Sequence, residues 1–351
     1  MNLTFYLKKL KTLDMSRFND CAKRVSVKVH KPWRIVLADI LYCTAKYGSG
    51  WVDYEAFEMY RMNAKERGEI LTIGKNNELF KKYNDSRYLQ YFEDKAIFNK
   101  KFHDFMKRDW IMIGEGKVYG HIEGTALTED DLVIGVGPED FKKFLSDKEY
   151  IIVKPLSLSC GHGIEKIKVA DWEVEELYDH LLKNDTPLCE EVVIQDETMS
   201  LLNSSSVNTI RVTTILKDGD AKIVSGGIRM GRDGNIVDNF NSGGLGVIYD
   251  RKTGTVISDG FDRARNVYET VPESGIRLKG FQIPQWDAIV AMVKDAALVV
   301  PQVGYVGWDV CVSRDHGPLL IEGNSFPGQH NAQEPKLNAG TYKAVLEALE
   351  E

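Results

Sequence analysis

Three oxygen-bearing side chains near the end of the sequence have the types and spacing of a magnesium site. Residues 306–310 and 319–324 alternate as two strands joined by a polar turn. Side chains alternate between the faces of a strand, so Glu322 and Asn324 point the same way and Asp309 on the partner strand can reach them. Mg²⁺ takes few protein oxygens and fills its other positions with water and phosphate oxygens. The hairpin therefore predicts a magnesium–nucleotide site; three unrelated polar residues on a half-exposed hairpin are the alternative.

A second segment has the composition of a flap over phosphate groups. Residues 150–155 read as a short apolar strand that carries Lys154. A polar, glycine-containing loop follows with Ser159, Gly161, His162 and Gly163. Lysine supplies a mobile positive charge, and glycines let backbone N–H groups approach phosphate oxygens. The same pattern also fits an ordinary exposed hairpin, and the chain has no Gly-x-x-x-x-Gly-Lys-Ser/Thr loop.

Further charged and glycine-rich elements lie between these two segments. A strand at 187–194 carries two adjacent carboxylates, which must face opposite ways, so that one could face a ligand. Arg211 and Arg229 each lie on a predicted strand, and the planar guanidinium suits phosphate and carboxylate oxygens. The loop 238–246 combines glycines with amide side chains that can donate to an anion. Each element alone is compatible with an ordinary strand or turn.

In this order, the elements resemble the ATP-grasp superfamily, and within it the ATP-grasp proteins of sugar-transfer and exopolysaccharide loci. The resemblance runs from Tyr83 to the C-terminus and is carried by Glu93-Asp94-Lys95, Val153-Lys154-Pro155, Glu190-Glu191-Val192-Val193, Asn208-Thr209-Ile210-Arg211, Asp238-Asn239 with Ser242-Gly243-Gly244, Gly307-Trp308-Asp309 and Glu322-Gly323-Asn324. It implies an α+β ATP-grasp fold in which two α+β lobes clamp ATP, with Mg²⁺ as cofactor.

The resemblance also assigns roles to individual residues. The metal ligands would be Asp309, Glu322 and Asn324. The catalytic positions beside the transferred phosphate and the substrate carboxylate would be Arg211, Arg229 and Lys154. The nucleotide contacts would be Lys95, Lys154, Ser159, Gly161, His162, Gly163, Glu190, Glu191, Val193, Glu197, Asn241, Ser242 and Gly243. Among these, the resemblance places adenine near Glu190 to Val193 and the ribose near Glu197.

The implied reaction is transfer of the γ-phosphoryl group to a carboxylate, followed by attack of an amine or another nucleophile on the acyl phosphate. Phosphoryl transfer depends on positioning and charge neutralisation, which magnesium, lysines and arginines supply. No catalytic base is evident; His162 and His330 could accept a proton, but solvated loop histidines are the commoner case. A small-molecule kinase and a non-catalytic nucleotide-binding module are the alternatives. The expected substrates are small carboxylates and amines, including sugar-linked ones in polysaccharide biosynthesis.

Composition narrows the class of protein and its location. A net charge of −7 over 351 residues argues against a general nucleic-acid binder. Residues 1–34 hold nine Lys or Arg against Asp14 and Asp20, which permits contact with an anionic membrane surface, although a solvated helix is the simpler interpretation. Five scattered cysteines without a Cys-x-x-Cys predict neither disulfides nor a zinc site, and no apolar run could span a bilayer. We expect a cytoplasmic protein.

Periodicity and resemblance together predict three regions: a helical N-terminal region at 1–82, a first lobe with the phosphate flap at 83–188, and a second lobe with the metal hairpin at 189–351. A long helix should run from Asn84 or Asp85 towards Phe105. Strands should dominate from 110 to 169 and from 189 to 257, with helices at 171–183 and 285–300. Residues 260–280 show no periodicity and are a candidate substrate loop.

Overall fold

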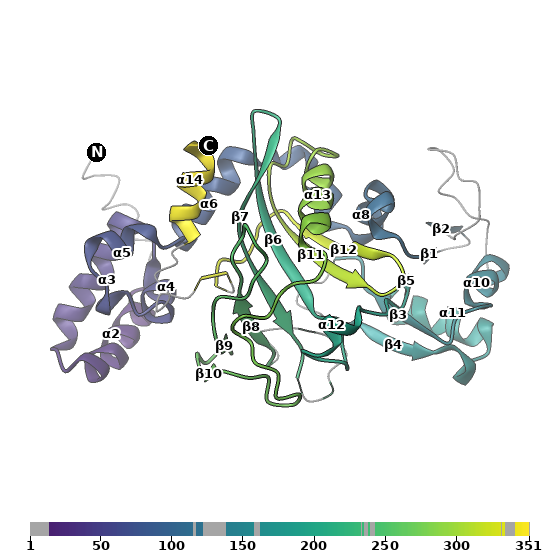
Figure 1. Cartoon of the computed structure of the whole chain (residues 1–351), viewed down its shortest axis with the longest axis horizontal. Helices are drawn as coiled ribbons and strands as arrows, with labels where there is room; N and C mark the ends of the chain where they lie inside the picture. The colour runs from purple at the N-terminus through teal and green to yellow at the C-terminus, as the bar shows by residue number, and fades with distance from the viewer. Residues whose placement is uncertain are drawn as a thin grey trace. The chain divides into compact units, whose positions relative to one another are not determined.

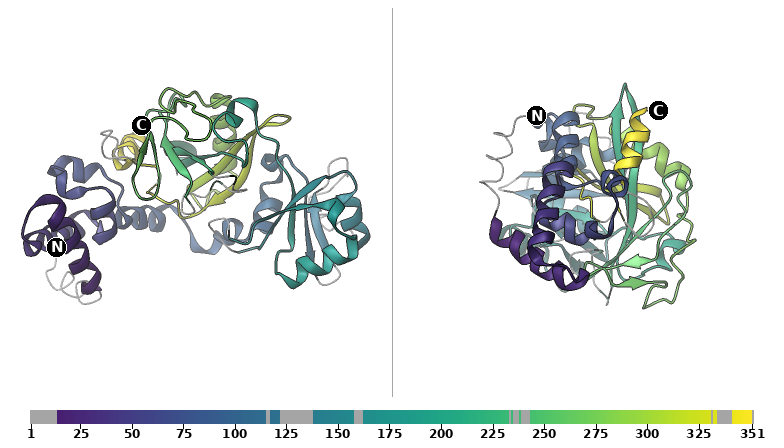
Figure 2. Two further views of the ribbon diagram at one scale, coloured as in Figure 1. Left: turned by 90° about the horizontal axis from the view of Figure 1, so that it is seen from below. Right: turned by 90° about the vertical axis from the view of Figure 1, so that its left-hand side faces the viewer.

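The chain forms two compact units. The computed structural model (Figures 1 and 2) describes residues 14–114, 117–121, 138–157, 162–232, 234, 238, 243–330, 332–333 and 341–350. One unit combines residues 1–82 with 332–351, and the other comprises residues 83–331. The sequence interpretation had given residues 332–351 to the second lobe. Of the helices described, none has the length and apolar content needed to cross a bilayer.

The first unit is helical, as expected for the N-terminal region. Its described helices are α2 (Met15–Val29), α3 (Trp33–Tyr47), α4 (Gly50–Ala56), η1 (Met59–Arg61), α5 (Ala64–Glu69), α6 (Ile73–Tyr83) and, from the far end of the chain, α14 (Thr341–Glu350). Phe18, Ile40 and Phe57 lie in its core. The buried Gln333 side chain accepts from Leu71 N and donates to Leu71 O, both at 2.8 Å. This amide pair ties the C-terminal segment to the helical unit.

A five-stranded antiparallel sheet forms one half of the second unit. Its strands are β1 (Trp110–Gly114), β2 (Lys117–His121), β3 (Tyr150–Lys154), β4 (Glu165–Lys168) and β5 (Leu188–Glu191), in the order β2-β1-β5-β3-β4. The helices α10 (Pro138–Leu145) and α11 (Val174–Lys183) contribute Phe141, Phe144 and Leu177 to a core shared with Ile151. A short η3 (Val169–Asp171) precedes α11.

This sheet differs from the sequence interpretation in two ways. The predicted lobe boundary at 188/189 falls inside the first sheet, because β5 is its central strand and Leu188 and Cys189 are fully buried there. Alternation shows that residues 188–191 form a strand but not which sheet it joins. In addition, α10 lies within the stretch from 110 to 169 that was expected to be dominated by strands.

The predicted long helix after Asn84 is instead a series of short helices: η2 (Ser86–Tyr88), α7 (Gln90–Glu93), α8 (Lys95–Lys101) and α9 (His103–Met106). Asp94 is extended, and its side chain accepts from Ala96 N and Ile97 N, so it ends α7 and caps α8. The segment packs on the second sheet rather than the first. Phe92 and Phe102 lie edge-on to Trp308, with ring centroids 5.9 and 5.6 Å away.

A seven-stranded antiparallel sheet forms the other half. Its strands are β6 (Thr209–Lys217), β7 (Asp220–Met230), β8 (Leu245–Ile248), β9 (Gly260–Phe261), β10 (Val267–Tyr268), β11 (Tyr305–Ser313) and β12 (Gly317–Asn324), in the order β10-β9-β8-β7-β6-β11-β12. The predicted hairpin is thus β11 and β12, while β9 and β10 come from the stretch without periodicity. The short α12 (Glu197–Ser200) precedes β6.

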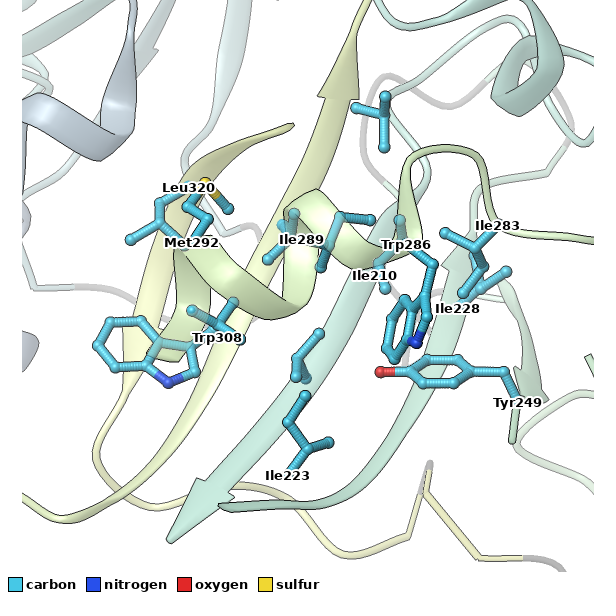
Figure 3. Close-up of a cluster of buried hydrophobic side chains, with 14 of the residues drawn as sticks. Ile210, Ile223, Ile228, Tyr249, Ile283, Trp286, Ile289, Met292, Trp308 and Leu320 are labelled. Carbon is cyan, nitrogen blue, oxygen red and sulfur yellow. The ribbon is translucent and has the colours of Figure 1, made fainter. Parts of the chain in front are cut away.

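Helix α13 (Trp286–Ala297) covers one face of this sheet, close to the predicted 285–300. Figure 3 shows Ile289 and Met292 of α13 directed at the strands that carry Ile210, Trp308 and Leu320. These side chains are buried in the largest core of the molecule. Because that face is filled by apolar packing, polar side chains of the same strands must lie on the opposite face.

Candidate functional site

The polar residues of the seven-stranded sheet share the face opposite α13. Asp309 pairs across the ladder with Arg211 on one side and with Glu322 on the other. On β6, two residues from Arg211, Thr209 pairs with Arg229. Directly paired residues, and residues two apart on one strand, point to the same face. Side chains from four adjacent strands therefore converge at one place.

A β-bulge aims Glu322 into this cluster. Asp309 pairs with Glu322, but the next residue, Val310, pairs with Leu320, so Ile321 is an extra residue in β12. In a regular strand Leu320 and Glu322 would point to the same face. The bulge instead lets Leu320 enter the core while Glu322 faces Asp309. The alternation argument used for Glu322 and Asn324 is valid because both lie on the same side of the bulge.

Asp309 is the centre of the cluster. It is fully buried, and Arg211 holds it with two bonds, Nε to Oδ1 at 2.5 Å and Nη2 to Oδ2 at 2.9 Å. The Arg229 Nη2 lies 2.7 Å from Oδ2. Burial alone would raise the pKa of Asp309, but the two guanidinium groups hold it well below its usual range. Asp309 is therefore a fixed anion between two fixed cations.

Glu322 and Asn324 complete the predicted metal ligands. Burial and the neighbouring Asp309 raise the pKa of Glu322, so two acidic groups are crowded together. The Asn324 Nδ2 lies 3.3 Å from an oxygen of each acid. Among the described residues, no group of three His, Cys, Asp or Glu side chains lies in an arrangement that could hold a metal ion.

This donor set fits Mg²⁺. Two carboxylates and an amide are hard oxygen donors, and a cation would relieve the repulsion between the crowded acids. The Asn324 Nδ2 now faces the two acids. Rotating the side-chain amide by 180° would place Oδ1 there instead, and this oxygen could bind a metal ion. Asp309, Glu322 and Asn324 are the residues that would hold the ion.

Arg229 is held in place from a second side. Its Nε and Nη2 both donate to Thr209 Oγ1, at 3.0 and 2.9 Å, and Asp238 lies 3.6 Å from Nε. The Asp238 carboxylate accepts from both the hydroxyl and the backbone N–H of Thr209. Burial raises the pKa of Asp238, although Arg229 opposes this. Asp309 and Asp238 outweigh burial and raise the pKa of Arg229, which stays charged.

A second cluster of charges joins the two sheets. Glu190 on β5 is buried, and its Oε2 accepts from Lys154 Nζ at 2.6 Å and from Arg108 Nη2 and Nε at 2.7 and 3.0 Å. Its Oε1 accepts from Asn99 of α8 at 2.9 Å. Burial would raise the pKa of Glu190, but Arg108 and Lys154 lower it to about 2. Burial lowers the pKa of Lys154, an effect that Glu190 opposes and Arg108 reinforces.

The predicted adenine segment connects the two sheets. β5 ends at Glu191, whose backbone N–H donates to Asp109 O at 2.9 Å, and Gln195 forms an isolated bridge with Ser313 at the end of β11. Val193 lies half-buried between these anchors. Glu197, the predicted ribose contact, is exposed at the start of α12. The Glu190 carboxylate is bonded inside the protein to Asn99, Arg108 and Lys154.

The remaining predicted residues belong to neither of these two charged clusters. Lys95 begins α8, and its backbone N–H donates to Leu156 O at 3.1 Å, two residues beyond Lys154. His162, Gly163 and Gly243 are exposed. Four predicted contacts lie outside the described residues: Ser159, Gly161, Asn241 and Ser242. His330 is half-buried, and its carbonyl accepts from Arg265 at 3.3 Å.

Sequence reasoning missed Arg108 and Asn99. Both precede the first predicted strand, and neither stands in a motif, because their role depends on Glu190, which is distant in the sequence. The pair Thr209 and Asp238 lay within motifs that were recognised, but without assigned roles. A buried arginine or asparagine cannot be told from an exposed one by residue type alone.

Comparison with known proteins gives a family match. The model of the family described as sugar-transfer associated ATP-grasp matches residues 74–337, well over half of the chain. A comparison with curated proteins found no match.

Solved structures that resemble this chain include the ATP-grasp ligase PsnB complexed with minimal precursor, Mg and ADP, at 12% identity and a TM-score of 0.41, covering 76% of this chain and 62% of that chain. D-alanyl-alanine synthetase A from Vibrio cholerae shows 11% identity and a TM-score of 0.39, with 75% of this chain and 66% of that chain covered. N5-carboxyaminoimidazole synthase from Aspergillus clavatus shows 11% identity and a TM-score of 0.41, with 74% and 53% covered. This chain thus spans less than two thirds of the PsnB chain.

The family match extends over both sheets and the hairpin described above. The chain belongs to the sugar-transfer-associated ATP-grasp family and has the ATP-grasp fold, preceded by a helical N-terminal segment.

Proposed function

We propose that this protein is an ATP-dependent ligase that phosphorylates a carboxylate and passes the resulting acyl phosphate to an amine. The observation that carries the proposal is the cluster on the seven-stranded sheet, where Asp309 and Glu322 lie beside Arg211 and Arg229. Acids for a magnesium ion and arginines for phosphoryl and carboxylate oxygens are thereby within one side-chain length of each other. The ADP-forming reaction is the one that such an arrangement suits best.

In this proposal the protein supplies positioning and charge. Magnesium, held by Asp309, Glu322 and Asn324, would neutralise the phosphate oxygens of ATP. Arg211 and Arg229 would hold the oxygens of the carboxylate substrate and the transferred group. Both arginines are already fixed by Asp309, so little reorganisation is needed when charge develops during transfer.

The nucleotide would lie between the two sheets. Lys154 ends β3 and Lys95 begins α8, and the 3.1 Å bond from Lys95 N to Leu156 O brings these two positions together. Both lysines would serve the phosphates. The backbone from Glu191 to Val193 crosses from one sheet to the other and would contact the adenine ring, with Glu197 towards the ribose. The flap residues Ser159, Gly161, His162 and Gly163 would cover the phosphates, and Asn241, Ser242 and Gly243 would donate to the transferred group.

The family description supports substrates connected with sugar transfer. We therefore propose a sugar acid, an amino acid or another small carboxylate as the acceptor, in polysaccharide or cell-surface precursor synthesis, and a cytoplasmic site of action. Arg211 and Arg229 suit the carboxylate that all these acids share.

The test is a trapping experiment. The protein is incubated with Mg·ATP, hydroxylamine and pools of amino acids, hydroxy acids and uronic acids, and ADP and acyl hydroxamates are measured by mass spectrometry. A hydroxamate that depends on one acid supports the ligase and identifies the acid. ADP with a stable phosphorylated product and no hydroxamate would replace the ligase by a kinase.

Two substitutions in the same hairpin provide a test variant and its control. Asp309→Asn should lower product formation by about 100-fold or more, whereas Asp315→Asn in the exposed turn between β11 and β12 should leave it unchanged. Full activity of the folded Asp309→Asn protein would contradict the proposed site.

A further inference from the structure

Arg108 connects the two sheets of the ATP-grasp unit through side-chain bonds to both of them. It lies between α9, which packs on the second sheet, and β1 of the first sheet. It is 5% exposed. No sequence motif includes it, and nothing in the proposed chemistry so far uses it.

All five N–H donors of Arg108 are used, and they point in two directions. Nε and Nη2 hold the carboxylate of Glu190. Nη1 donates to Leu320 O at 2.6 Å and to Met106 O at 3.4 Å, and Nη2 reaches Ile321 O at 3.5 Å. Since a guanidinium carries five N–H groups in a rigid plane, such a set fixes both partners relative to each other.

The carbonyls of Leu320 and Ile321 belong to the bulge that turns Glu322 towards Asp309. A bulge disrupts the regular ladder and leaves backbone groups that need other partners. In the described sheet β12 is the edge strand, and Arg108 donates to the carbonyls of Leu320 and Ile321 at the bulge. The same guanidinium therefore stabilises the backbone feature that aims a metal ligand.

On its other side, Arg108 shares Glu190 with Lys154. The Lys154 Nζ is 2.6 Å from Glu190 Oε2, so a lysine that turns towards phosphate oxygens loosens this bond. Without another cation, Glu190 would then be a buried, uncompensated charge, which is strongly unfavourable. Arg108 and Asn99 keep Glu190 paired when Lys154 turns away.

We propose that Arg108 is a positioning residue that releases Lys154 for the nucleotide by keeping Glu190 neutralised, and that it couples this release to the bulge beneath Glu322. This inference rests on the proposed function, because it takes Lys154 as a phosphate contact. In this inference the carboxylate of Glu190 holds or releases Lys154, and it does not contact the adenine ring.

The test measures binding of AMPPNP with Mg²⁺, and of adenosine, to the full chain by calorimetry. Arg108→Met should weaken AMPPNP binding at least about tenfold, because Lys154 becomes the only cation on Glu190 and is retained there. Adenosine binding should change little. Adding Glu190→Gln to Arg108→Met removes the charge that retains Lys154, so the double variant should bind AMPPNP more tightly than the single variant.

Adenosine binding separates positioning from a purely structural role, since a damaged fold would weaken adenosine binding in the single variant as well as AMPPNP binding. Arg108→Lys keeps the charge without the fork and should show a smaller loss; it replaces Arg108→Met if that variant does not fold. AMPPNP binding unaffected in the single variant, or not improved in the double variant, overturns the inference. A wild-type protein that binds no AMPPNP would instead contradict the proposed function itself.

Discussion

The two sheets of the ATP-grasp unit position their charged residues in different ways. In the seven-stranded sheet, Asp309, Arg211 and Arg229 lie on adjacent strands and meet through strand pairing. In the five-stranded sheet, Lys154 and Glu190 lie on neighbouring strands, but the cluster is completed by Arg108 and Asn99 from outside the sheet. The first arrangement follows from local periodicity, and the second depends on how distant segments pack.

This difference explains what the sequence could and could not predict. Alternation along β11 and β12 was sufficient to bring Asp309 and Glu322 together, because strand geometry fixes side-chain direction. The same argument did not reveal that a bulge separates Glu322 from Leu320, since a bulge has no distinct residue pattern here.

The strongest test of the strand-built cluster is Asp309→Asn. It leaves two largely buried guanidinium groups without their shared, fully buried anion, and breaking a buried pair in this way costs about 3–5 kcal/mol. We also expect product formation to fall by about 100-fold or more. Thermal unfolding and the hydroxamate assay measure the two effects, with Asp315→Asn as the control. Wild-type stability in Asp309→Asn would show that the arginines do not depend on this acid.

Gly226→Ala tests whether strand pairing holds the backbone beneath Arg211 rigidly. Tyr249 OH donates to Arg211 O at 2.8 Å, and a Cβ at Gly226 would overlap both of these groups. We expect a loss of about 3 kcal/mol in the free energy of unfolding, since overpacking a core forces side chains and backbone to shift. Gly328→Ala, where a Cβ meets no atom within 4 Å, is the matched control in denaturant unfolding. Equal stability of the two variants would mean that Tyr249 can move without cost.

Lys154→Met tests the packing-built cluster. It removes the proposed charge-assisted contact to phosphate, worth about 1.5–3 kcal/mol, so AMPPNP binding should weaken about 10- to 100-fold while adenosine binding is kept. Lys168→Met on the exposed edge strand β4 is the control, and calorimetry is the measurement. A matching loss of adenosine binding would indicate that Lys154 supports the base site instead.

The smallest effect concerns pH. The pKa of Glu190 falls from 4.5 to about 2 in the folded protein, so between these values the unfolded state binds more protons. The stability contributed by Glu190 is therefore complete above about pH 4.5 and lost as the pH falls towards 2. The stability of the wild type minus that of the Arg108→Met, Glu190→Gln variant should decrease across this window. Melting temperatures measured from pH 5 to 2.5 check this, and a constant difference would contradict the assigned charge.

The predicted elements of the fold also divide into those set by local periodicity and those set by the packing of distant segments. The helical N-terminal region, α11, α13 and the β11–β12 hairpin follow from periodicity within each segment. The position of β5, the packing of α7 to α9 and the membership of residues 332–351 are decided by contacts between distant segments. Arg108 belongs to this second group, which is why its role was visible only in three dimensions.

The amide pair between Gln333 and Leu71 has a consequence for synthesis of the chain. The helical unit draws its last helix, α14, from residues 341–350, so it cannot close until the ribosome has translated the whole ATP-grasp unit. Until then, residues 14–82 lack the contacts that α14 and Gln333 make with them while both sheets fold. Folding in the cell should therefore be sensitive to premature termination near the C-terminus, although α14 lies after the Asp309 cluster in the sequence.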